Sequence, residues 1–204
     1  MGNYNKLNEI QLSVLAEIGN IGAGNAATAL SHILADRVMM SVPALQIIDV
    51  SHMTNILGGP ENEVAGILVN MTDDVEGMLL FLLDKEFVCL LINALMDKNI
   101  NSFNDISDME MSAIMEMGNI LAGSYVSAIS MLTNLDIKLS PPQIAVDMVG
   151  AILSYPAAQF GEMGDELLFI EEDFLSGTSQ IKSHLLIMPE PKSLDKIMAS
   201  LGVS

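Results

Sequence analysis

A twelve-residue pattern occurs twice in this chain. The segment Ser13–Gly24 reads SVLAEIGNIGAG, and the segment Ser112–Gly123 reads SAIMEMGNILAG. One offset (112 − 13 = 99) relates the Ser, Glu, Asn, Ala and Gly positions that the copies share, without a gap. We therefore predict a single domain of 204 residues built from two similar halves, about residues 1–103 and 104–204.

Each copy of the pattern is predicted to lie inside a long helix. Asn8 with Gln11, and Ser107 with Glu110, have the spacing of a capping box, in which two side chains satisfy the free backbone N–H groups of a helix start. The first motif helix is therefore expected to run from about residue 9 to residue 36, and the second to begin just after Ser107.

The polar residues of each copy share one face of the predicted helix. With 3.6 residues per turn, three residues fall within about 40° of Ser13 around the helix axis: Glu17, Asn20 and Gly24. Large apolar residues such as Leu15 and Ile18 fall on a different arc, which is expected to face the core. The second copy repeats this phase, with a stripe formed by Ser112, Glu116, Asn119 and Gly123. Each stripe is therefore predicted to be exposed and to meet a partner.

Glycines inside the motif helices need a reason, because each lowers helix stability by roughly 1 kcal/mol relative to alanine. Gly22 points toward the core and is predicted to allow tight packing there, whereas Gly24 lies on the polar stripe, where a partner needs room. For Gly19 and Gly118 the sequence offers no explanation.

The remaining segments predict a mixed fold. A β-rich run interrupted by proline follows each motif helix, at residues 37–50 and 136–149. Hairpin strands are expected at residues 64–71 with 76–83 and at 166–171 with 181–188, and short closing helices at 85–96 and 193–201. The prediction is an α/β, more strictly α+β, fold with pseudo-twofold duplication, in which two long motif helices pack on a shared β-sheet. Residues 99–105 form the polar connector, and residues 160–165 form a flexible insertion.

Composition excludes several classes of function. The chain has 8 basic and 26 acidic residues and a formal net charge of −18, which repels nucleic acid and anionic membrane surfaces. The most apolar region, residues 78–96, carries three charged residues near its centre, so no membrane insertion is expected. The lone Cys89 precludes an internal disulfide, and the first residues lack the layout of a signal peptide. We therefore expect a cytoplasmic protein.

The motif itself argues against metal binding and nucleophilic catalysis. Glu-x-x-Asn lacks the histidine of di-iron helices, and the chain has no tryptophan to build a sugar site around Glu17 and Glu116. The order G-x-x-G-x-G inside a helix differs from a phosphate-binding loop. A carboxamide can instead hold a water in line with a phosphorus atom, and a carboxylate can hold a lysine. A polar contact between the two motif helices is the alternative explanation.

The repeated pattern resembles the signature of the CheC family of chemotaxis phosphatases, whose relatives include CheX and FliY. The resemblance rests on Ser-x-x-x-Glu-x-x-Asn followed after 22 intervening residues by proline, at Pro43 and again at Pro142. It covers essentially the whole chain, and two copies of the motif are typical of CheC, whereas CheX-like proteins keep one.

The resemblance implies an activity and a set of roles. Such a protein dephosphorylates the aspartyl-phosphate of the response regulator CheY, with Mg2+ held by the regulator and no cofactor or metal bound by this chain. By position, the attacking water would be oriented by Asn20 and Asn119, and the active-site lysine of the regulator contacted by Glu17 and Glu116. The first motif position is Ser in both copies, where the family also uses Asp, so an auxiliary acidic contact is not expected.

The resemblance also implies binding to CheD, the receptor deamidase, and motif helices that lie side by side. A second hypothesis is therefore an adaptor that sequesters CheD or senses phosphorylated CheY, with turnover secondary. A third is a structural component of the flagellar switch. Catalysis by substoichiometric protein distinguishes the first hypothesis from the second, and co-sedimentation with rotor proteins tests the third.

Overall fold

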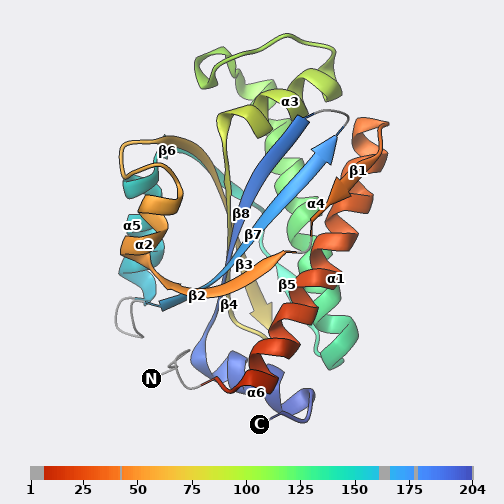
Figure 1. Ribbon diagram of the computed structural model, residues 1–204, viewed down its shortest axis with the longest axis vertical. Coiled ribbons are helices and arrows are strands. Elements are labelled where there is room, and N and C mark those ends of the chain that lie inside the picture. The colour runs from red at the N-terminus through yellow and green to blue at the C-terminus, as the bar shows by residue number, and fades with distance from the viewer. Residues whose placement is uncertain (1–6, 42, 161–165, 177–178, 204) are drawn as a thin grey trace.

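The computed structural model describes residues 7–41, 43–160, 166–176 and 179–203. Within these ranges the chain forms one antiparallel β-sheet of eight strands with helices on both faces (Figure 1). The helices are α1 (Glu9–Leu34), α2 (Val50–Ile56), α3 (Lys85–Met96), α4 (Asp108–Thr133), α5 (Val149–Phe160) and α6 (Pro191–Ser200). The strands are β1 (Val38–Met40), β2 (Ala44–Asp49), β3 (Glu63–Asp73), β4 (Gly77–Leu83), β5 (Ile137–Leu139), β6 (Gln143–Met148), β7 (Glu166–Ser176) and β8 (Ser179–Pro189). The α+β fold class is confirmed.

The two faces of the sheet are covered by different helices. On one face α1, α3, α4 and α6 enclose the larger core, and on the other α2 and α5 enclose a smaller one. Alternate side chains of β4 serve the two cores, with Phe81 in the larger and Leu82 in the smaller. This double burial explains why β4 reads as the continuous apolar run GMLLFLL.

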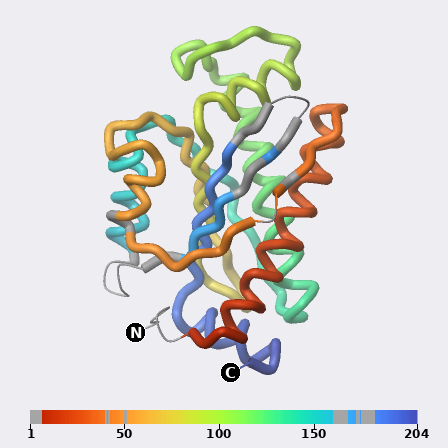
Figure 2. Tube along the Cα trace, in the orientation of Figure 1, coloured from red at the N-terminus to blue at the C-terminus, as the bar shows by residue number. Residues whose placement is uncertain are grey.

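The two halves of the chain exchange strands. The order along the sheet is β1-β7-β8-β4-β3-β5, with β2 also paired to β7 and β6 to β3. In Figure 2 the orange β2 of the first half lies against the blue β7 of the second half. The prolines expected to interrupt the β-rich runs, Pro43 and Pro142, each precede the longer strand of such a run. Each half therefore completes the sheet of the other.

The motif helices begin where the capping boxes predict. The backbone N–H of Gln11 donates to Oδ1 of Asn8 at 2.9 Å, and the N–H of Asn8 donates to Oε1 of Gln11 at 2.9 Å. A capping box of Ser107 and Glu110 likewise starts α4. α1 ends at Leu34, two residues before the predicted end, because Ala35 adopts a left-handed conformation with φ of 48°.

Packing explains three of the motif glycines. A Cβ built at Gly22 would lie 2.5 Å from Cδ1 of Tyr125, so close packing at this position is confirmed. A Cβ at Gly19 would lie 3.1 Å from Cδ1 of Ile170 on β7, and one at Gly118 would lie 2.5 Å from Cγ2 of Ile67 on β3. These two glycines let the helices approach the sheet, which the sequence did not reveal.

Two helices were not predicted. α2 and α5 directly follow β2 and β6, in segments to which the sequence analysis assigned no element beyond residues 50 and 149. Three of the four hairpin strands are longer than predicted, with 11 residues each in β3, β7 and β8. The predicted insertion at 160–165 begins at the end of α5, and its residues 161–165 lie outside the described part of the chain. The connector contains a 3-10 helix, Phe103–Asp105.

Candidate functional site

The first stripe lies on the solvent-facing side of α1. Ser13 and Glu17 are exposed and Asn20 is half-buried. Gly24 is exposed as well, and a Cβ built there would meet no atom within 4 Å. Three of the four stripe positions are therefore exposed as predicted, and Asn20 is partly covered, whereas Leu15 and Ile18 of the predicted apolar arc are buried.

The second stripe repeats this arrangement on α4. Ser112, Glu116 and Asn119 are exposed, and Gly123 is half-buried with open space where a Cβ would stand. The Oγ of Ser112 donates a hydrogen bond to the backbone carbonyl of Asp108 at 2.9 Å, one turn earlier in the same helix. Its oxygen keeps acceptor capacity toward solvent.

The Glu and Asn side chains of both stripes are available to a partner. Across the described residues, no hydrogen bond or ion pair engages the side chain of Glu17, Asn20, Glu116 or Asn119. An exposed carboxylate and an exposed carboxamide one turn apart can together bind a cation and orient a water. Each stripe thus presents one acceptor-only group and one donor–acceptor group.

The contact between the motif helices is made by other residues. α1 and α4 lie side by side and run in opposite directions (Figure 1). Tyr125 of α4 packs on Gly22 of α1, and the Tyr125 ring also lies 6.1 Å, between ring centroids, from Phe81 in the sheet. Because the Glu and Asn side chains do not take part in this contact, a polar bond between the motif helices is the wrong explanation for them.

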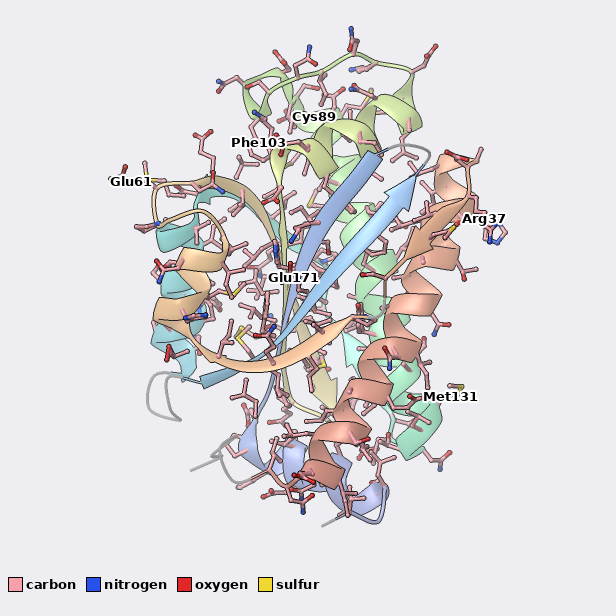
Figure 3. All side chains as sticks on the ribbon, viewed as in Figure 1. Arg37, Glu61, Cys89, Phe103, Met131 and Glu171 are labelled. Atoms are coloured by element: carbon pink, nitrogen blue, oxygen red, sulfur yellow. The ribbon has the colours of Figure 1, made fainter. Side chains whose placement is uncertain are left out.

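The site is an exposed helical surface and not a pocket. A hollow of about 710 Å3 lies between the α2–β3 loop and the start of α3, and none of the predicted site residues lines it. Its lining includes Glu61 and Glu171, which Figure 3 labels away from α1. Small-molecule sites are concave, so the flat stripes suit a macromolecular partner.

The hollow is lined in part by a histidine of β8. His184 is 3% exposed and stacks on Phe169 with ring centroids 5.7 Å apart. Burial lowers the pKa of His184, and the nearby carboxylate of Asp84 opposes that shift. Burial in turn raises the pKa of Asp84. His184 directly precedes the apolar run LLIM of β8, and this neighbouring run was the signal that it is buried.

Two further features of the described residues bear on the class of site. No group of three or more His, Cys, Asp or Glu side chains there is arranged to hold a metal ion. No helix in the same part of the chain has the length and apolar character that crossing a membrane requires.

Comparison with known proteins places this chain among chemotaxis proteins. A model of the CheC-like family matches residues 10–47 and 109–146, two segments with the same offset as the repeat (109 − 10 = 99). The chain is 31% identical over 215 aligned residues to the CheY-P phosphatase CheC of Bacillus subtilis, with all of both chains covered. It is 28% identical over 139 residues to the flagellar motor switch phosphatase FliY of B. subtilis, covering 68% of this chain and 36% of that protein.

A solved structure shares the fold. The crystal structure of FliY from Thermotoga maritima superposes with a TM-score of 0.76 at 23% identity, covering 97% of this chain and 98% of that one. The similarity extends over the sheet and both helical layers, because nearly all of each chain is matched. Because both motif segments match the family model and the chain is 31% identical to CheC over its full length, this chain belongs to the CheC-like family.

Proposed function

We propose that this protein is a phosphatase that hydrolyses the aspartyl-phosphate of the chemotaxis response regulator CheY. The observation that carries the proposal is the duplicated, solvent-accessible Glu/Asn pair. Its side chains are unengaged by other described residues and occupy the same position of two helices. Full-length similarity to a CheY-P phosphatase supports the same activity.

The chemistry needs little from this chain, because an acyl phosphate is a reactive mixed anhydride. Asn20, and Asn119 in the second site, would hold a water in line with the phosphorus through their carboxamides. The water oxygen bonds to phosphorus as the bond from phosphorus to the Asp oxygen breaks. The products are the free carboxylate and inorganic phosphate, which takes up the protons of the water. Glu17 and Glu116 would bind the regulator's lysine and so fix the orientation of the two proteins.

Other features of the proposal rest on family resemblance. Mg2+ is expected on the regulator and not on this chain, and a cytoplasmic location follows from that of its proposed substrate. CheD is a further proposed partner. These expectations do not depend on the hydrolysis itself. If CheD still binds the variant that lacks both Asn side chains, then CheD uses a different surface of this protein.

The test is release of phosphate from phosphorylated CheY by substoichiometric protein. Asn20→Ala and Asn119→Ala should each remove the contribution of one site, and the double variant should lose more than about tenfold in kcat with a smaller change in KM, because the carboxamide acts in the transition state. Asn25→Ala is the matched control, since Asn25 is exposed on α1 but outside the stripe. Full activity of the double variant would overturn the proposed sites, and protection only at stoichiometric protein would favour an adaptor.

A further inference from the structure

Two exposed apolar side chains are related by the repeat. Seven large hydrophobic residues are well exposed in the described part of the chain: Ile10, Met39, Leu95, Met109, Met131, Met148 and Tyr155. Ile10 is 63% exposed and Met109 is 66% exposed, and the repeat offset joins these two (109 − 10 = 99) and no other pair of the seven. Single exposed hydrophobics are ordinary on protein surfaces, but their recurrence at one position of both halves requires a shared cause.

Helix formation does not supply that cause. Both residues occupy the second position of a motif helix, where the helix dipole favours acidic side chains. The capping box uses the N-cap and third positions, and the residues before the caps, Leu7 and Ile106, pack against the core as expected for a hydrophobic staple. Ile10 and Met109 are therefore free of the contacts that start each helix.

Helix geometry places each of these residues on the working face. Ile10 precedes Glu17 by seven residues, so the two lie about 20° apart around the axis and about 10 Å apart along it. Asn20 lies about 15 Å along the axis from Ile10. One partner of a standard interface buries about 800 Å2, a patch roughly 30 Å across, which includes all three residues. The same spacing relates Met109 to Glu116.

We propose that Ile10 and Met109 are apolar anchors that contact the phosphorylated response regulator, each beside the Glu/Asn pair of its own site. This inference rests on the proposed function and extends the docking surface of each stripe by about one helical turn beyond Ser13 and Ser112. The partner it requires is a regulator with an apolar patch about 10–15 Å from its phosphorylated aspartate, by the same helical rise. An anchor at this distance from the phosphorus acts on binding and not on the chemical step.

The test separates the two sites. Ile10→Ala is made in an Asn119→Ala background, so that the first site alone turns over, and Met109→Ala is made in an Asn20→Ala background. Each should raise KM by roughly three- to tenfold with kcat unchanged, and each should weaken binding to a beryllofluoride-activated regulator by a similar factor. Met148→Ala is the matched control, since Met148 is 49% exposed at the end of β6 and belongs to neither motif helix.

The outcomes are distinct. Because alanine favours helices and both side chains are exposed, the variants should keep the wild-type circular dichroism spectrum. Unchanged KM and unchanged regulator affinity would reject the proposal that Ile10 and Met109 are anchors, but would not affect the assignment of the Asn sites. A fall in kcat with unchanged affinity would also reject the anchors. Conversely, activity that survives the Asn20→Ala, Asn119→Ala double variant would reject the proposed sites, whatever the Ile10 and Met109 variants show.

Discussion

The ring of Tyr125 on α4 lies directly against the backbone of Gly22 on α1, where an added Cβ would stand 2.5 Å from Cδ1 and 2.9 Å from Cε1. The repeat relates Gly22 to Leu121 and Tyr125 to Ala26 (22 + 99 and 125 − 99). At both of these repeat-related positions, the side chain on α1 is small and the one on α4 is large. The Glu and Asn residues of the stripes, by contrast, are the same in both copies. Packing between the helices tolerates unlike residues provided that the total volume is filled.

This relationship predicts opposite effects for alanine at two neighbouring glycines. In Gly22→Ala the new methyl group meets a fully buried ring, which costs about 3 kcal/mol by overpacking against a gain of about 1 kcal/mol in helix propensity. Urea unfolding should therefore show a net loss of roughly 2 kcal/mol. Gly24→Ala meets open space and should gain up to about 1 kcal/mol.

The same pair of variants also tests the role of Gly24. If a partner approaches the stripe closely, Gly24→Ala should weaken turnover of phosphorylated CheY although the protein is more stable. Gly22→Ala, measured at a temperature where it is folded, should turn over normally. Full activity of Gly24→Ala would reject Gly24 as a partner contact.

Tyr125 leads to a prediction about its hydroxyl group. The side chain is fully buried, and its Oη has no hydrogen-bond partner among the described residues. A buried polar atom without a partner lowers stability, so removing it should do no harm. We expect Tyr125→Phe to be neutral or to raise the free energy of unfolding by roughly 1 kcal/mol. A loss larger than about 1 kcal/mol in chemical denaturation would contradict the assignment of Tyr125 as a purely apolar packing residue.

Acid stability should depend on the N-terminal cap of α4. Glu110 is 1% exposed, and its carboxylate accepts hydrogen bonds from Lys98 Nζ, from Ser107 Oγ, and from the Ser107 backbone N–H at 2.8 Å. These bonds lower the pKa of Glu110 from 4.5 to about 2. Because the folded state favours the ionised form, the stabilisation is fully present above pH 4.5 and is lost as the pH falls toward 2.

The measurement is the midpoint of urea unfolding between pH 6 and pH 3. Wild-type protein should lose stability over this range, whereas Glu110→Gln should be less stable at pH 6 and less sensitive to acid. Asp74 contributes a dependence of the same sign, because its hydrogen bond to Lys196 lowers its pKa. The difference between wild type and Glu110→Gln is therefore the informative quantity, and a constant difference across the range would contradict the prediction.

Local signals in the sequence predicted most of the elements that display the site. Capping boxes gave both helix starts, and helical phase separated Ile18, which is buried, from Glu17, which is exposed. These features depend on residues within one or two turns of each other, which is why periodicity alone reveals them. The helical phase of the stripe residues did not predict phosphoryl transfer. That prediction came from the resemblance to a known family.

Long-range features escaped the sequence analysis. Gly118 is explained by Ile67 and Gly19 by Ile170, partners that lie 51 and 151 positions away (118 − 67 and 170 − 19). The pairing of β2 with β7 and of β6 with β3, each across the two halves, depends on which strand edge is free. No local sequence pattern predicts this pairing. α2 was missed because its seven residues form too short a segment for helical periodicity to show.

The carboxylates of the two stripes should act through charge. Glu17→Gln and Glu116→Gln keep the shape of the side chain and remove the negative charge that would bind the regulator's lysine. Together they should raise KM for phosphorylated CheY several-fold at low salt, and the rise should shrink as salt screens the remaining attraction. Glu61→Gln is the matched control, because Glu61 is exposed on the α2–β3 loop, away from α1 and α4 (Figure 3). Its substitution changes the net charge by the same amount as either single stripe variant. If Glu61→Gln raises KM as much as either stripe variant, the overall charge of −18 and not a specific ion pair governs binding.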